Sequence, residues 1–148
     1  MEEELLNLLT FFSRIFAEQI TKYTFGDVHL GKDAFIVDYI GKNVRCTQTD
    51  LVINLVLSKS AASRRVNKLV EMGLIVRKKR DDDNRWEELS LTNAGVQVYE
   101  HFLSHREFFL DLLIHDLSKE EILLFRRVLL NFQKTVTPRP QKKRRILK

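Results

Sequence analysis

The segment from residue 47 to residue 95 constrains the fold of this chain more than any other part. It holds two short amphipathic helical patterns, residues 47–55 and 58–73, joined by a tight turn. Two strand-like stretches follow, with Asp81-Asp82-Asp83-Asn84 between them as a solvated turn. This order predicts a helix-turn-helix that leads into a two-stranded wing, an arrangement suited to placing its second helix in a major groove of DNA.

Capping residues mark the ends of both helical patterns. Thr47 followed by Asp50 is a variant capping box for the first, and Ser58 or Ser60 caps the second. Gly73 ends the second, because glycine adopts the left-handed conformation of a helix terminus without a steric penalty. The inward face of the second helix is predicted to comprise three apolar residues: Ala62, Val66 and Leu69.

Long helical patterns flank this unit on both sides. Residues 2–22 form one, residues 32–41 a shorter one, and residues 93–115 follow the wing. A last helix is opened by Ser118, whose capping box includes Glu121. The fold class is therefore mainly α with a small β-wing. The terminal helices carry more apolar residues than one chain can cover, which predicts a homodimer.

The organisation along the chain follows from these elements. We expect a single domain over residues 1–138, with a DNA-binding part at 47–95 and dimerisation helices at 1–30 and 96–138. Residues 139–148 carry six basic groups and no acid, and are expected to form a flexible tail.

Positive charge is concentrated on the predicted helix and wing. The chain has a net charge of +5, but without the basic tail it would be −1. Residues 59–85, by contrast, have nine Lys or Arg against four acids, a local charge of +5. This distribution supports binding to double-stranded DNA where the total charge alone would not.

Several classes of protein are disfavoured. No apolar run approaches the roughly 20 residues of a membrane span, and the acidic start Met1-Glu2-Glu3-Glu4 lacks the basic segment of a signal peptide. A single cysteine excludes an internal disulfide and fits the cytoplasm, where we expect the protein. No phosphate-binding glycine loop or catalytic triad is evident, so we expect neither an enzyme nor a cofactor.

The ordered set of motifs resembles that of the MarR family of transcriptional regulators. It comprises an apolar helix-turn-helix, a Gly-Leu-Ile step, an Arg, an acidic and basic wing tip, and a Leu-Thr-x-x-Gly opening of the next helix. The residues that carry the resemblance are Leu51, Leu55, Leu57, Ser58, Leu69, Gly73-Leu74-Ile75, Arg77, Asp83-Asn84-Arg85, Leu89 and Leu91-Thr92-Asn93-Ala94-Gly95. Two departures are Val52, where the family commonly has alanine, and the basic tail.

The resemblance implies a winged-helix homodimer with residues 58–72 as the recognition helix and the Asp83/Arg85 tip in the minor groove. It also implies a pseudo-palindromic operator, usually bound by a repressor that small phenolic ligands, oxidants or metals release. A small-molecule effector is therefore a possible partner.

Helical geometry places four residues on the outer side of the recognition helix, namely Ser60, Ala61, Arg64 and Lys68. Arg64 can bind guanine bidentately, Ser60 can bond base edges or phosphate, and the Ala61 methyl can meet thymine. At the wing, Arg85 could enter an A·T minor groove, oriented by Asp83. The full set of candidate DNA-binding residues is Lys59, Ser60, Ala61, Ser63, Arg64, Arg65, Lys68, Arg77, Asp83 and Arg85. The competing interpretations are a merely solvated basic face and an ordinary acidic turn.

Two further candidates carry weaker signals. Cys46 is interpreted as a small core residue and not as a redox sensor. His101 and His105 have the i, i+4 spacing of metal ligands, but no third ligand is evident, so we expect solvated side chains and no metal site. The alternative functions are a metal-responsive regulator of the same fold and a winged-helix protein–protein adaptor.

Overall fold

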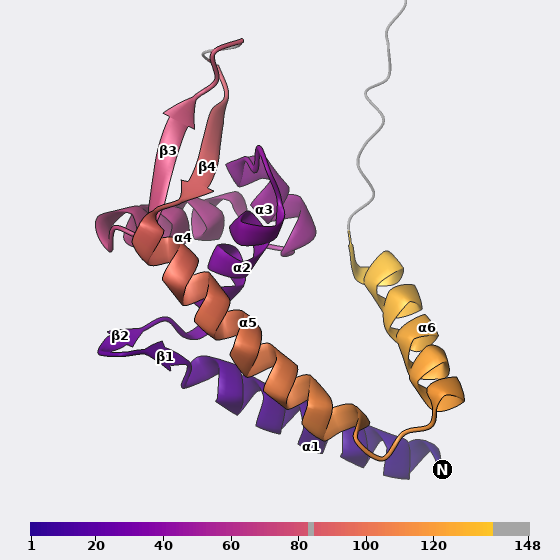
Figure 1. Ribbon diagram of the computed structural model, residues 1–148. Coiled ribbons are helices and arrows are strands. Elements are labelled where there is room, and N and C mark those ends of the chain that lie inside the picture. Colours follow the sequence, from indigo (N-terminus) through magenta and orange to yellow (C-terminus); the bar gives the residue numbers. More distant parts are fainter. Residues whose placement is uncertain (83–84, 138–148) are drawn as a thin grey trace, which may run out of the picture.

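The computed structural model describes residues 1–82 and 85–137, arranged as a small central unit with long helices at both ends (Figure 1). The elements, in chain order, are α1 (Glu2–Thr21), β1 (Thr24–Phe25), β2 (Val28–His29), the 3-10 turn η1 (Gly31–Asp33), α2 (Ala34–Lys42), α3 (Gln48–Asn54), α4 (Lys59–Glu71), β3 (Ile75–Lys79), β4 (Glu87–Leu91), α5 (Asn93–Ile114) and α6 (Lys119–Val136). No helix in these ranges is both long enough and apolar enough to span a membrane.

The predicted capping boxes are present. Thr47 accepts a hydrogen bond from the Asp50 amide, and Asp50 accepts one from the Thr47 amide at 2.8 Å. The sequence left Ser58 and Ser60 as alternative N-caps of α4. In the structure Ser58 is the N-cap, because its hydroxyl accepts a hydrogen bond from the Ala61 amide at 3.1 Å. Gly73 has a φ of +72°, the left-handed conformation predicted for it.

The wing is an antiparallel pair in which Ile75 faces Leu91 and Lys79 faces Glu87. Cys46 adds a one-residue bridge to the outer edge of β4, where the Leu89 amide donates to the Cys46 carbonyl at 2.7 Å. Ile75, Leu89 and Cys46 are all buried, so one face of the wing completes the core of the central unit. The far half of the hairpin projects beyond the helices (Figure 1).

The start of α5 is packed tightly against the start of the wing. A Cβ atom at Gly95 would lie 2.0 Å from the Leu74 carbonyl oxygen, so only glycine fits there. The Thr92 hydroxyl also donates to the Gly73 carbonyl oxygen at 2.6 Å. These contacts fix the direction in which α5 leaves the wing.

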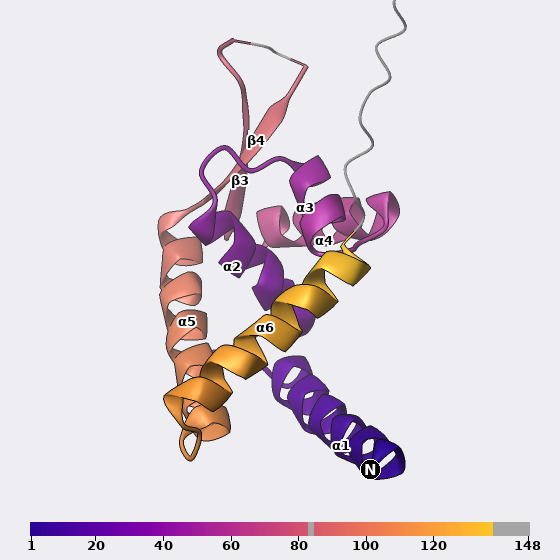
Figure 2. The same cartoon turned by 90° about the vertical axis from the view of Figure 1, so that its right-hand side faces the viewer.

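From the wing, α5 runs across α1, and α6 stands apart from both (Figures 1 and 2). The α1–α5 contact is aromatic: the ring centroids of Phe16 and Phe109 are 5.4 Å apart. At the end of α1, Tyr23 meets Phe102 edge-on at 4.8 Å. None of the residues of α6 is buried within the chain.

Two details differ from the sequence-based expectations. The second helix begins at Ala34 and not at residue 32, because η1 occupies the preceding turn. A short β1–β2 hairpin around Gly26, with a φ of +57°, was not predicted, since two-residue strands have no detectable alternation. Asp83, Asn84 and residues 138–148, which include the predicted tail, lie outside the described residues.

Candidate nucleic-acid interface

The recognition helix α4 is fixed by one completely buried face. Ala62, Val66 and Leu69 have no solvent exposure, as the sequence predicted. On the far side Lys59, Ser60 and Arg64 are exposed, with Ser60 also close to the capping Ser58 hydroxyl at 3.2 Å. The helix therefore presents two cations and a hydroxyl in the first two turns, where a recognition helix meets base edges.

The other candidates on α4 are less free to contact DNA. Ala61 and Ser63 are half-buried. Lys68 Nζ donates to Asp33 Oδ2 at 2.7 Å, and Arg65 Nε lies 3.8 Å from Asp33 Oδ1. Asp33 lies just before α2 and is only 7% exposed. Its buried carboxylate therefore binds two cations on one side of the recognition helix. Sequence patterns did not single out Asp33, because its partners are more than 30 residues away along the chain.

Residues of the wing are also held by charged contacts. Arg77 Nη1 lies 3.2 Å from Glu87 Oε2 across the hairpin, and Arg77 Nη2 donates to Asn67 of α4. Arg77 therefore ties the wing to the recognition helix. Arg85 is exposed just before β4. The expected partner of Arg85, Asp83, is outside the described residues, so their pairing stays a prediction.

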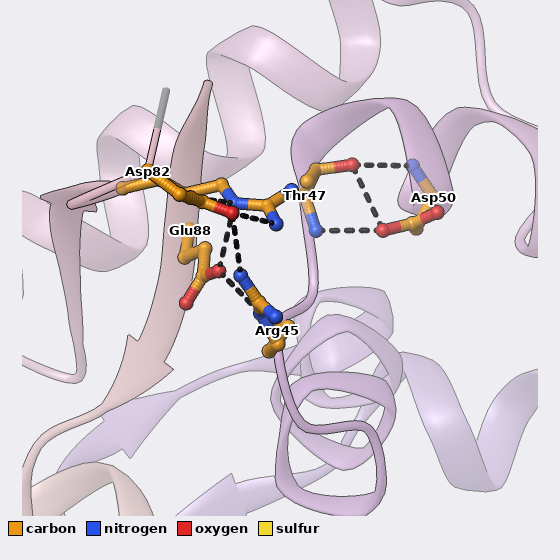
Figure 3. A network of polar contacts seen from close by, with 6 residues as sticks. Arg45, Thr47, Asp50, Asp82 and Glu88 are labelled. Atoms are coloured by element: carbon orange, nitrogen blue, oxygen red, sulfur yellow. Dashed lines mark hydrogen bonds and ion pairs between the residues drawn. The ribbon is translucent and has the colours of Figure 1, made fainter. Parts of the chain in front are cut away.

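A four-residue network connects the wing to the loop between α2 and α3 (Figure 3). Arg45 Nε donates to Glu88 Oε1 at 3.0 Å, and Arg80 Nε and Nη2 donate to the two carboxylate oxygens of Asp82 at 3.0 Å each. The Arg80 hydrogen bond lowers the pKa of Asp82, and the hydrogen bond to Glu88 raises that of Arg45. Sequence analysis missed Arg45, which lies outside the predicted helices and wing.

Cys46 is a core residue, as predicted. Its side chain is 2% exposed, and burial raises the pKa of the thiol to about 12. Since the thiolate is the reactive form, this environment is the opposite of the one that activates a redox-sensing cysteine.

The histidine pair meets the expectation of two solvated side chains in part, since His101 is exposed and His105 is half-buried. The Tyr23 hydroxyl and His101 Nδ1 are hydrogen-bonded at 2.7 Å, and the His105 ring centroid is 5.3 Å from that of Tyr23. Both imidazoles thus belong to the contact between α5 and the end of α1. Within residues 1–82 and 85–137, no three His, Cys, Asp or Glu side chains gather as metal ligands.

Two cavities border the helix-turn-helix. One, of about 410 Å³, lies beside α4 and is lined in part by Asp33, Arg65 and Lys68. The larger, of about 760 Å³, lies between α2, the end of α3 and the end of α6, with Tyr39 and Lys134 among its lining residues. Both are open to solvent, and their volumes fall in the range of small-molecule sites.

The helix-turn-helix with its wing and exposed basic helix defines a protein of the winged-helix DNA-binding class. A MarR-family sequence model matches residues 31–85. The HTH-type transcriptional regulator BilQ of Clostridium symbiosum is 30% identical over 118 residues, which cover 75% of this chain and 80% of BilQ. The chain therefore belongs to the MarR family of helix-turn-helix transcriptional regulators, and as such it is a DNA-binding regulator and not an enzyme.

Solved structures confirm the fold. The transcriptional regulator SlyA superimposes with a TM-score of 0.78 at 19% identity, covering 89% of this chain and 93% of SlyA. The Staphylococcus aureus MepR–DNA complex gives a TM-score of 0.75 at 20% identity, covering 88% of this chain and 96% of MepR. The likeness extends over the terminal helices as well as the central unit.

Replacing Asp33 by Asn should lower the free energy of unfolding by ~1–3 kcal/mol, because it removes the charge that holds Lys68 and Arg65 at a buried site. Urea unfolding followed by circular dichroism measures the change. Asp116→Asn is the control, since the Asp116 side chain is 98% exposed. Equal midpoints for the two variants would show that Asp33 does not hold α4.

Cys46 should resist iodoacetamide at pH 8 in the folded protein and react rapidly in urea, because its thiol titrates near 12 when folded and near 9 when exposed. A pKa raised by folding stabilises the protein below about pH 9, and this contribution disappears as the pH rises toward 12. Mass spectrometry of the alkylated fraction checks the prediction. Rapid labelling of the native chain would contradict it.

Proposed function

We propose that this protein is a repressor that binds a pseudo-palindromic operator as a homodimer, with one α4 helix in each of two major-groove half-sites. The observation that carries the proposal is the pairing of an exposed basic face on α4 with uncovered apolar faces on the terminal helices. A C2 dimer built on those faces would present two copies of α4 related by a two-fold axis, which a palindromic site requires.

The apolar faces lie on α1, the end of α5 and α6. Their exposed large side chains are Leu5, Leu6, Leu8, Leu9, Phe11, Phe12, Phe16, Phe108, Leu110, Leu112, Leu123, Leu124, Val128, Leu129, Leu130, Phe132 and Val136. A monomer rarely exposes so many large apolar side chains on its helices to water. A second copy of the chain offers the same helices in return, so residues 1–30 and 96–138 are proposed as the dimerisation part.

Residues 47–95 are proposed as the DNA-binding part. Arg64 would read a guanine, Ser60 and Ala61 would meet base edges, and Lys59 would contact phosphate. Arg85 would enter the minor groove, oriented by Asp83. Ser63, Arg65, Lys68 and Arg77 complete the proposed site, but the Asp33 contacts of Arg65 and Lys68 favour positioning α4 over reading bases.

Structures of relatives support this mode of binding. Streptococcus pneumoniae FabT and a Listeria monocytogenes MarR-family regulator were both crystallised with DNA, at 22% and 23% identity to this chain. The larger cavity, between α2, α3 and α6, is proposed as the place for a small-molecule effector, since its occupant would touch both the helix-turn-helix and a dimerisation helix. The basic tail is proposed to strengthen binding to all duplexes alike.

The purified chain should have about twice the 17.5 kDa mass of one copy in solution. Phe132→Glu should shift the mass toward a monomer, because it places a charge in the proposed interface, where Phe132 is 65% exposed in one chain. Light scattering at micromolar concentration measures both. Val44→Glu makes a similar change at a 94% exposed site on the α2–α3 loop and should leave the dimer intact. A folded wild-type monomer would rule out the dimer.

Arg64→Ala should weaken operator binding by ~1–3 kcal/mol and binding to random duplexes by less, because a guanine contact is lost only at the operator. The operator is first selected from a random duplex pool, which also reveals the half-site spacing. Titrations with selected and random duplexes give the two affinities, with Lys22→Ala on the exposed end of α1 as the control. Equal losses on both duplexes would make Arg64 a phosphate contact.

A further inference from the structure

Arg45 has an unusual backbone for its residue type. It lies between α2 and α3 with a φ of +62°, a left-handed conformation that glycine or asparagine adopts more easily. The next two residues fix this turn: Cys46 bridges to Leu89 of the wing, and Thr47 caps α3. The turn directs the Arg45 side chain toward the wing (Figure 3).

The side chain joins two acids that stand on different parts of the wing. Arg45 Nε is 3.0 Å from Glu88 Oε1 on β4, and Arg45 Nη2 is 3.4 Å from Asp82 Oδ2 beyond β3. Arg80 closes the ring, with Nη2 3.0 Å from Asp82 Oδ2 and Nε 3.4 Å from Glu88 Oε1. Each carboxylate therefore contacts two guanidinium groups, so the four residues act as one network and not as isolated surface pairs.

The ring lies on the face of the wing opposite to Arg77. Glu88 faces Lys78 in the hairpin, whereas Arg77 faces Leu89, and successive residues of a strand point to opposite sides. Arg77 binds Asn67 of α4, whereas Arg45 belongs to the α2–α3 loop. The wing is thus attached to the recognition helix on one face and to the α2–α3 loop on the other.

We propose that Arg45 is a positioning residue that sets the angle of the wing relative to α4, so that both can contact one duplex together. This inference rests on the proposed function, in which the wing reaches the minor groove. Arg45 acts through Glu88 and Asp82 and makes no contact with DNA itself.

The direction in which one substitution changes DNA affinity distinguishes this positioning role from a direct contact with phosphate. Glu88→Gln removes an anion and leaves two arginines with more free charge, so simple electrostatics makes DNA binding tighter. If Glu88 serves to hold the wing, the same change weakens binding. Arg45→Lys gives a second distinction, because lysine keeps the charge for a phosphate but cannot bridge two carboxylates with a planar fork.

The experiment measures the affinity of the full chain for its selected operator. Arg45→Asn, which tolerates the left-handed backbone, and Arg45→Lys should both bind about threefold to thirtyfold more weakly, the factor expected for losing two exposed ion pairs. Glu88→Gln should also bind more weakly. Lys42→Gln, which breaks the 2.8 Å Lys42–Asp38 pair on α2, removes one charge as a control. Where the wing contacts DNA, tighter binding by Glu88→Gln together with unchanged binding by Arg45→Lys would overturn the proposal.

Trp86 provides a direct readout of wing motion. It is the only tryptophan, it is 48% exposed, and its carbonyl accepts from the Arg80 amide at 3.1 Å. Time-resolved anisotropy of the DNA-free protein should show larger nanosecond motion in Arg45→Asn than in wild type or Lys42→Gln. Equal motion in the three proteins would overturn the positioning role, whatever the affinities are.

The emission of Trp86 separates failure of the inference from failure of the proposed function. In wild type it should change on addition of operator, because the wing approaches DNA. Larger free motion in Arg45→Asn, with no emission change in wild type and no loss of affinity, would sustain the positioning role and overturn the wing contact. An emission change in wild type that Arg45→Asn reproduces in full, at equal affinity, would sustain the wing contact and overturn the positioning role.

Discussion

The structure depends on the burial of one face of α4. Ala62, Val66 and Leu69 are completely excluded from solvent, so the helix cannot rotate without exposing apolar surface. A turn of 100° per residue then determines what the other face presents. The outward direction of Arg64 and Ser60 is therefore a consequence of packing. The packing of α4 in the core fixes the orientation of the DNA-facing surface.

Charge has a second role around that surface. Residues 59–85 are strongly basic, yet Asp82 lies within them and Asp33 and Glu88 lie beside them in the fold, and each of these acids is placed against two cations. Acids so close to a DNA-binding face would repel phosphate if they stood alone. Because arginine and lysine side chains surround them, these acids orient the cations while repelling DNA phosphate only weakly. The positive charge of the face is thus divided between residues free to meet DNA and residues that hold α4 and the wing.

Local signals in the sequence predicted most of the fold. The Thr47–Asp50 and Ser118–Glu121 capping boxes act within one turn, and the left-handed Gly73 depends on residues beside it. Asp33 and Arg45 could not be found this way, because their partners lie 32 to 43 positions away and become neighbours only after folding. The Tyr23–His101 contact, 78 positions apart, was missed for the same reason.

The long helix α5 connects the two halves of the molecule mechanically. Its first turn has no free space against the wing, since Gly95 already contacts the Leu74 backbone. Farther along, it packs on α1 through Tyr23, Phe102 and the Phe16–Phe109 pair. A close-packed helix transmits displacement because it cannot absorb it locally. A displacement of α1 at these contacts therefore acts through α5 on the start of the wing, and with it on the end of α4 at Gly73.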